Sequence, residues 1–248
     1  MTEALIAVPA YEQSSDQEVA FQAVDYILRV LKKNMVFGMT WGRAMHEFVE
    51  QLAKDERLRS LSFQNVKVVP FLGTPGAIQS DSWNTTTYSN TLATKVGNLL
   101  HCASYNLSAP MYVEGTKEKE LIESIDEIAK VLHMAETADI ALIGIGSMQD
   151  DSSIIKAEIR TREEYKELVR KGAVGEIVGR IYDKNGQTVD EDLKRKMVGI
   201  SLDKIAKIPV RVGMSYGKDK IEAIKGAIAG GLVNVLVTDV PTAELLLK

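Results

Sequence analysis

The sequence predicts an α/β fold in which a mostly parallel sheet is covered by helices on both faces to give three layers. Short apolar runs alternate with amphipathic segments of helical length along the 248 residues, and this alternation is typical of βαβ units. The run Ile140-Ala141-Leu142-Ile143 is apolar without a break, as expected for a strand buried on both sides. With 45% hydrophobic and 26% charged residues, the composition is that of a globular chain with a large core.

The expected elements follow one another along the whole chain. Strands are expected at residues 35–39, 66–72, 139–145, 208–214 and 232–238. Apolar spacing near 3.6 residues predicts helices at residues 42–54, 90–101, 117–134 and 218–229, and a short helix after Pro241. Together they predict one domain over residues 1–248, with a small subdomain around residues 100–135.

Three local signals mark where elements begin and turn. Ser15 and Glu18 have the spacing of a capping box, and so do Thr161 and Glu164, so that a helix is expected after each. Asn185-Gly186 is a strong hairpin signal because both residues tolerate positive φ. We therefore expect residues 177–182 and Val189 to flank a turn at residues 183–186.

Charge, cysteine content and the lack of targeting segments limit which partners and which cellular compartment the sequence fits. A net charge of −4 gives no general attraction to nucleic acid, and the single cysteine, Cys102, cannot form an internal disulfide. The first residues lack the basic region of a signal peptide, and no apolar run is long enough to span a membrane. The three histidines lack the spacing of zinc sites. We expect a cytoplasmic protein without membrane contact, metal or cofactor.

The segment "FGMTWGRAM" is the first candidate site, because it lies where an expected strand ends and a helix begins. Unpaired amides and the positive end of the helix dipole meet at such a junction and favour an anion. Gly38 and Gly42 would let the backbone approach a ligand, Thr40 offers a hydroxyl, and Arg43 could grip phosphate oxygens. The segment is neither a P-loop nor a dinucleotide fingerprint. A plain tight turn, with Trp41 in the core, explains it equally well.

Two further junctions carry glycine beside polar groups. Gly144-Ile145-Gly146-Ser147 follows a buried strand, and residues 215–220, which include Lys218 and Lys220, follow another. Each alone is more typical of a tight loop or a solvated first helical turn. In a parallel sheet, however, all three junctions lie along one edge, where ligands of open α/β sheets bind. Their convergence favours a binding site.

The motifs in series resemble a known family. "GMTWGRAM", "VKVVPFLG", "NTLATKVG", "LSAPMYV", "ADIALIGIGSM", "GAVGEIVGRIYDKNG" and the stretch from "VGISLDKIAKIPVRVGMSYGKDK" to "VTDVPTAELLL" resemble, in this order, the sugar-binding domain of SorC-type bacterial transcriptional regulators. The resemblance implies a Rossmann-like α/β fold related to ribose-5-phosphate isomerase, glucosamine-6-phosphate deaminase and CoA transferases. It also implies that a phosphorylated sugar controls the oligomeric state and DNA affinity of the regulator.

By resemblance, site residues can be carried over by position. The phosphate loop would be residues 38–45, with Trp41 inside it. The loop after the second strand, the sugar-lining positions and the polar contacts would be Gly73, Thr74, Asn90, Gly144, Gly146, Glu176 and Lys220. Two positions depart from the family pattern: Ala44 stands where relatives usually have threonine, and Thr74 stands at the second glycine of a Gly-Gly loop.

The resemblance also frames the function and its rivals. Family members carry an N-terminal helix-turn-helix, whereas the opening helix expected here is single and acidic. We therefore expect an effector-binding domain that is not an enzyme, forms homodimers or homotetramers, and contacts DNA only through a helix-turn-helix absent from this chain. A sugar-phosphate isomerase or deaminase on the same scaffold, with Glu176 as base, is the alternative. An assembly module without a ligand is a third hypothesis.

Overall fold

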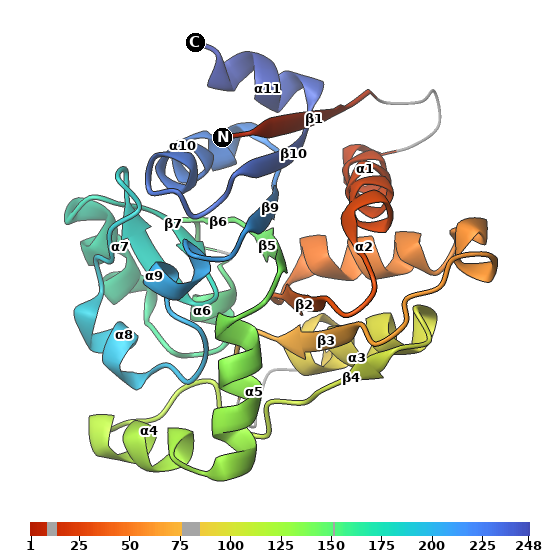
Figure 1. Ribbon diagram of the computed structural model, residues 1–248. Coiled ribbons are helices and arrows are strands. Elements are labelled where there is room, and N and C mark those ends of the chain that lie inside the picture. The colour runs from red at the N-terminus through yellow and green to blue at the C-terminus, as the bar shows by residue number, and fades with distance from the viewer. Residues whose placement is uncertain (9–13, 76–84, 151) are drawn as a thin grey trace.

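The computed structural model describes residues 1–8, 14–75, 85–150 and 152–248 (Figure 1). Within these ranges, seven parallel strands form the central sheet. From one edge to the other they are β1 (Glu3–Ala7), β10 (Val235–Asp239), β9 (Val210–Met214), β5 (Ile140–Gly144), β2 (Val36–Met39), β3 (Lys67–Pro70) and β4 (Ala103–Ser104). The expected parallel sheet is confirmed.

The order of the strands creates a switch point in the middle of the sheet. From β2 the chain adds β3 and β4 toward one edge, and from β5 it adds β9 and β10 toward the other. β2 and β5 lie side by side, with Phe37 opposite Ile140 and Met39 opposite Leu142. Loops that follow these two strands diverge, and ligands of such sheets bind in the opening between them.

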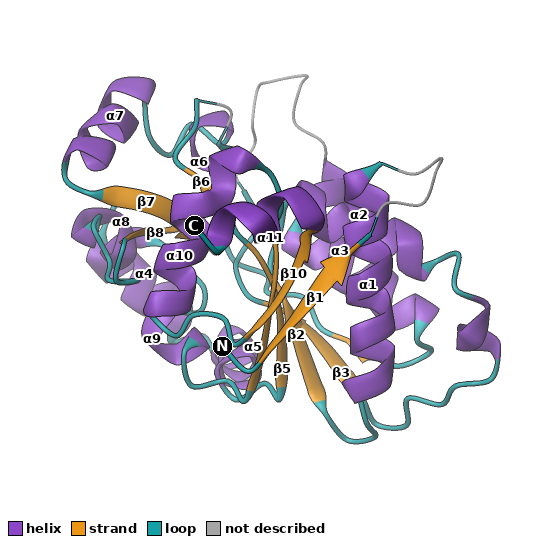
Figure 2. Ribbon diagram, turned by 90° about the horizontal axis from the view of Figure 1, so that it is seen from above, coloured by secondary structure: helices purple, strands orange, loops and turns teal. Residues whose placement is uncertain are grey.

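Helices cover both faces of the sheet, which confirms the three-layer prediction (Figures 1 and 2). One face packs against α1 (Ser15–Val30), α2 (Arg43–Leu52) and α3 (Ser89–Leu99), which share a buried core with β2, β3, β5, β9 and β10. The other face packs against α5 (Asp126–Glu136), α9 (Leu202–Ile205) and α10 (Ile221–Ala229). In β5, for example, Ile140 and Leu142 are buried on the first face, and Ala141 and Ile143 are buried on the second.

A small antiparallel sheet lies beside the second face. It contains β6 (Gly146–Ser147), β7 (Ala173–Ile177) and β8 (Arg180–Asp183), in that order. The remaining described elements are α4 (Thr116–Glu123), α6 (Ser153–Lys156), α7 (Arg162–Arg170), α8 (Glu191–Lys196), α11 (Val240–Leu246) and the short 3₁₀ turns η1 (Glu56–Arg59), η2 (Thr85–Thr87) and η3 (Lys218–Lys220).

One of the two predicted capping boxes is confirmed. Thr161 Oγ1 accepts from the amide of Glu164, and a Glu164 carboxylate oxygen accepts from the amide of Thr161 at 2.8 Å. At α1, by contrast, Ser14 is the capping residue, and its backbone carbonyl accepts from the amides of Gln17 and Glu18. Ser15 already lies in the first turn, and the Ser14 side chain makes no capping bond, so the capping box expected at Ser15 is wrong.

Two other expectations need correction. The helix expected over residues 117–134 is two helices, α4 and α5, which are separated at residues 124–125, where Ser124 Oγ donates to the carbonyl of Leu121. The segment 177–182 is not one strand, because β7 and β8 are joined by a turn at Val178 and Gly179. The Asn185-Gly186 turn exists beyond β8, with a φ of 73° at Gly186.

The expected subdomain around residues 100–135 stays a prediction. A separate buried cluster does lie there, formed by Leu107, Ala109, Ile128 and Val131. It also includes Val198, from a distant part of the sequence. The cluster therefore ties this region to the rest of the chain.

Candidate functional site

The predicted turn between β2 and α2 is present, and it places the start of α2 at the carboxyl edge of the sheet. Gly42 precedes the helix with a φ of 104°, in the left-handed region that favours glycine. A Cβ on Gly42 would meet no described atom within 4 Å, so glycine is required by the backbone and not by packing. The first turn of α2 lies within the described residues and contains no acidic residue. Its amides and dipole therefore favour an anion.

Thr40 ties the end of β2 to the end of β5. Its side chain is fully buried, and Oγ1 accepts a hydrogen bond from the amide of Gly144 at 3.0 Å. Its own amide donates to the carbonyl of Leu142. This pair of bonds holds together the two loops that diverge at the switch point. The structure thus gives Thr40 a positioning role, whereas a contact between its hydroxyl and a ligand stays a prediction.

Two of the expected site glycines have a packing role. Gly38 lies inside β2, and a Cβ there would lie 1.9 Å from Cε1 of Phe71, so glycine makes room for this ring. A Cβ on Gly73 would lie 2.5 Å from the carbonyl oxygen of Ala109. Both glycines therefore allow close packing next to the site, and their contact with a ligand stays a prediction.

A buried carboxylate lies next to the turn. Glu176, on β7, is 6% exposed and accepts hydrogen bonds from the side chain of Trp41 and from the amide of Gly179 at 3.4 Å. Burial raises the pKa of Glu176, and these bonds together with the charge of Lys220 oppose the shift. Gly146 is the cross-strand neighbour of Glu176. The structure thus brings Trp41, Gly146 and Glu176 together from three elements.

Lys220 joins the same region through a small polar cluster. Its Nζ donates to Ser147 Oγ at 3.0 Å, and Ser147 Oγ donates to Asp219 Oδ2 at 3.0 Å. The ammonium and the Asp219 carboxylate are 3.8 Å apart. Ser147 and Asp219 lie within two of the predicted junctions, but the sequence does not mark them as site residues. Serine next to Gly146 and aspartate next to Lys220 are common in loops, and only the fold shows that they meet.

Asn90 forms hydrogen bonds with both the loop after β3 and the loop after β4. Its amide nitrogen donates to Thr74 Oγ1 at 2.8 Å and to the carbonyl of Leu107 at 3.1 Å, and its Oδ1 accepts from the amide of Leu107. Both amide hydrogens are therefore used within the protein. Thr74 itself continues the loop by bonding with Ala109 and Met111. Asn90 and Thr74 are thus joined by a hydrogen bond at the base of the loop after β3. Residues 76–84 of this loop lie outside the described residues.

Arg43 supplies an exposed cation at the first position of α2. Burial and a hydrogen bond with Asp16 raise the pKa of Tyr216, and the positive charge of Arg43 opposes this rise. Tyr216 follows β9, so the guanidinium lies near a loop on the other side of the switch point. Arg43 and Lys220 are thus two cations at the same edge of the sheet.

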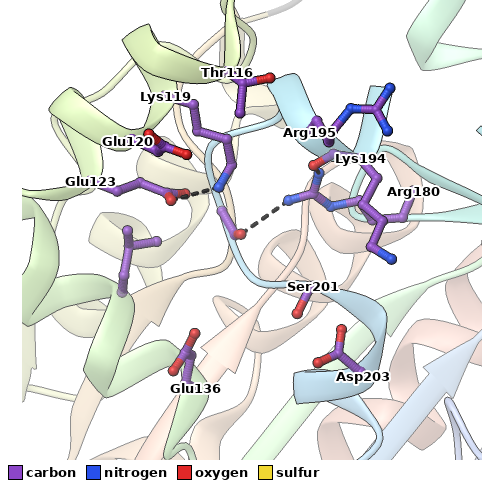
Figure 3. A pocket seen from close by; sticks show the side chains of 12 residues that line it. Thr116, Lys119, Glu120, Glu123, Glu136, Arg180, Lys194, Arg195, Ser201 and Asp203 are labelled. Atoms are coloured by element: carbon purple, nitrogen blue, oxygen red, sulfur yellow. Dashed lines mark hydrogen bonds and ion pairs between the residues drawn. The ribbon is translucent and has the colours of Figure 1, made fainter. Parts of the chain in front are cut away.

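The described residues contain no group of three or more His, Cys, Asp or Glu side chains that could hold a metal ion. In the same ranges, no helix has both the length and the apolar character needed to cross a membrane. A cavity of about 370 Å³ lies among α4, α5, α8 and α9, and none of the expected site residues lines it (Figure 3).

Fold and site together define a class of protein: an α/β domain whose parallel sheet presents a helix N-terminus, two cations and a buried carboxylate at its switch point. The comparisons then identify the family. The model described as "Putative sugar-binding domain" matches residues 1–248, and the chain belongs to this family of domains, which is homologous to the SorC and LsrR regulators.

The relatives are transcriptional regulators. The chain is 30% identical over 222 residues to the sorbitol operon regulator of Klebsiella pneumoniae, a match that covers 89% of this chain and 67% of that protein. It is 30% identical over 230 residues to the transcriptional regulator LsrR of Escherichia coli K12, covering 91% and 67%. The chain thus spans about two thirds of these regulators.

Solved structures show the same fold. The full-length sorbitol operon regulator SorC from Klebsiella pneumoniae superposes with a TM-score of 0.86 at 27% identity, covering 99% of this chain and 76% of that chain. A transcriptional regulator from Streptococcus pneumoniae TIGR4 superposes with a TM-score of 0.87 at 23% identity, covering 100% and 91%. The second likeness supports the fold alone.

Proposed function

We propose that this chain is the effector-binding domain of a SorC-type transcriptional regulator and that its effector is a phosphorylated sugar. The observation that carries the proposal is the Gly42 turn, which needs glycine although no described atom crowds it and which precedes a ten-residue helix without an acidic first turn. The phosphate would lie against the first amides of α2, with Arg43 beside it. Membership of a sugar-binding family supports the sugar.

The rest of the sugar would extend across the switch point toward β6 and β7. Glu176 would accept hydrogen bonds from sugar hydroxyls, Lys220 would bind the phosphate or the sugar, and the loops at Gly144 and Gly146 would lie along the ring. Asn90 would contribute the second lone pair of Oδ1, because its other hydrogen-bonding groups are used by Thr74 and Leu107. Thr40, Gly38 and Gly73 would hold these loops in place.

Binding would act on the regulator by favouring one assembly over another. A ligand shifts an equilibrium only by its difference in affinity between two states. We propose homodimers or homotetramers whose stability changes with the sugar phosphate, in a regulator that reaches bacterial DNA, in the cytoplasm, through a helix-turn-helix outside this chain. The domain itself would carry out no reaction.

The Arg43→Ala variant tests the phosphate contact. We expect it to weaken binding of a phosphorylated sugar by about 1.5–3 kcal/mol, the worth of a hydrogen bond to a charged group. A thermal-shift screen of ribose 5-phosphate, glucosamine 6-phosphate and other sugar phosphates selects the compound, because any ligand of the native state raises Tm. Calorimetry then compares Arg43→Ala with Arg59→Ala, which removes another exposed arginine, on η1 beyond the other end of α2.

Unchanged affinity in the Arg43→Ala protein would contradict the phosphate contact. If no sugar phosphate raises Tm, the hypothesis of an assembly module without a ligand gains support instead.

An enzyme on the same scaffold is the second candidate, and the buried carboxyl of Glu176 is the observation that favours it. A raised pKa suits a general base that must take a proton near neutral pH. Turnover of ribose 5-phosphate or glucosamine 6-phosphate, lost in Glu176→Gln, would establish this candidate. We expect no turnover, because the curated relatives are regulators.

A further inference from the structure

The turn between β7 and β8 holds a residue in a conformation that its side chain disfavours. Val178 has a φ of 55° and Gly179 a φ of 68°, as in the two-residue turns that suit hairpins. Glycine adopts this region readily, but a β-branched residue rarely does. Val178 is also 1% exposed. A buried valine stays in this conformation only where its surroundings impose it.

Arg180, the next residue, connects this turn to a distant segment. It is 4% exposed, and its guanidinium donates to the carbonyls of Lys194, Met197, Gly199 and Ile200 at distances between 3.0 and 3.4 Å. Figure 3 shows the bond to Gly199 at the wall of the cavity. Burial lowers the pKa of Arg180 to about 10, and the charges of Glu123 and Asp203 oppose this. The side chain therefore stays charged at neutral pH.

The two segments that Arg180 connects, the β7–β8 turn and residues 197–200, are each hydrogen-bonded to part of the candidate site. On one side, the amide of Gly179 donates to the carboxylate of Glu176. On the other side, the segment 197–200 pairs with the loop after β3: the amide of Gly73 donates to the carbonyl of Val198 at 3.1 Å, and the amide of Ile200 donates to the carbonyl of Phe71 at 2.9 Å. Arg180 thus lies between the carboxylate and the loop that carries Thr74.

We propose that Arg180 is a positioning residue for the candidate site: its four bonds to residues 194–200 hold the strained turn at Val178 and Gly179, and this clamp fixes both Glu176 and the loop after β3. Its role in ligand binding rests on the proposed function. The clamp itself is a property of the free protein, because none of its bonds involves a ligand. A lysine at position 180 keeps the charge but cannot make four bonds in a fixed plane.

Hydrogen exchange of the free protein tests the clamp. In Arg180→Lys we expect the amides of Gly73, Gly179 and Ile200 to exchange about tenfold faster or more. The reason is that the bonds of the guanidinium to the carbonyls of residues 194–200, which hold these segments in place, are lost. Arg160→Lys is the matched control. Arg160 is also buried, but it binds Asp190 and Asp192 instead, so these three amides should keep their rates.

Fluorescence adds a readout at Glu176 itself. The chain has two tryptophans, so in a Trp83→Phe background the emission comes from Trp41, which is hydrogen-bonded to Glu176. Lys220 and Tyr182 are the other ionisable groups that interact with this carboxylate. The pKa of Glu176 is raised mainly by burial. If the turn loosens in Arg180→Lys, Glu176 becomes less buried, so we expect the pH midpoint of Trp41 emission to fall. In Arg160→Lys the midpoint should stay unchanged. A Glu176→Gln protein, which should show no midpoint, verifies the assignment.

Exchange at the three amides that is no faster in Arg180→Lys than in Arg160→Lys would overturn the proposal. If Arg180→Lys alone does not fold, the comparison is made in a Val178→Gly background, where the turn is no longer strained. There the clamp predicts that the amides of Gly73 and Ile200 exchange faster in Arg180→Lys than in Arg160→Lys, and equal rates in the two variants would overturn it. Because no ligand is added, these outcomes are independent of whether a sugar phosphate binds.

Discussion

The Gly38→Ala variant is expected to lose about 1–3 kcal/mol of stability, typical of overpacked sites. The added methyl group would lie 1.9 Å from Cε1 and 2.1 Å from Cζ of Phe71. Phe71 is fully buried, so its ring cannot leave without disturbing the core. In a chain of this size, each kcal/mol lowers Tm by about 2–4 °C. Thermal unfolding followed by circular dichroism measures the loss.

Two further variants make this prediction specific. Phe71→Leu combined with Gly38→Ala removes the ring atoms that the methyl group would strike, and we expect it to recover part of the lost Tm. Gly115→Ala is the control, because a Cβ there makes only ordinary contacts, the nearest at 3.7 Å. A Gly38→Ala protein as stable as Gly115→Ala would show that Gly38 has no packing role.

The Glu176→Gln variant is expected to be more stable than the parent at neutral pH. Burial raises the pKa of Glu176 in the folded state above its ordinary value of 4.5, so folding favours the neutral carboxyl. The stability that this group contributes is fully present below about pH 4.5, and it is lost as the pH rises through the folded-state pKa. Each tenfold difference between the proton affinities of the folded and unfolded states changes the free energy of unfolding by about 1.4 kcal/mol. Glutamine does not ionise, so the variant avoids this loss.

The pH dependence of Tm between pH 4 and 8 checks the sign. The difference between Glu176→Gln and the parent should be small near pH 4 and grow toward neutral pH. Glu163→Gln, which changes an exposed glutamate, should leave the pH profile of the parent unchanged. A Glu176→Gln protein that becomes relatively less stable as the pH rises would mean that the ionised carboxylate stabilises the fold. In either case we expect weaker sugar-phosphate binding, because an amide accepts hydrogen bonds from sugar hydroxyls less strongly than a carboxylate does.

The fold class could be predicted because buried parallel strands and amphipathic helices have distinct patterns. What escaped prediction had weak local signals. β1 contains a short apolar run, residues 4–7, but it is mostly exposed and lies at the edge of the sheet, so this run alone does not mark it as a strand. The break between α4 and α5 contains neither glycine nor proline. At the β7–β8 hairpin, Asn185-Gly186 gave the stronger signal, while Val178 is a residue for which sequence predicts no turn.

The candidate site was predictable in position more than in role. Three strand-to-helix junctions could be placed along one edge, because all parallel strands end on the same side. The separate functions of the glycines could not be predicted, since Gly38 depends on Phe71 and Gly42 depends on a backbone angle. Likewise, the bond between Trp41 and Glu176 and the role of Arg180 depend on contacts between residues far apart in sequence, which no local pattern reveals.

The most direct test of the central claim compares two glycines that have similar φ values but lie at different places in the fold. Gly42 and Gly172 have φ values of 104° and 96°, and a Cβ added at either position would meet no described atom within 4 Å, so alanine at either position takes a disfavoured φ without a steric clash. Calorimetry with a sugar phosphate that raises Tm, and with the same sugar lacking phosphate, would be run on both variants. We predict binding that requires the phosphate and that falls sharply in Gly42→Ala but not in Gly172→Ala. Equal affinities in the two variants, or equal binding of the unphosphorylated sugar, would contradict an anion site at the start of α2.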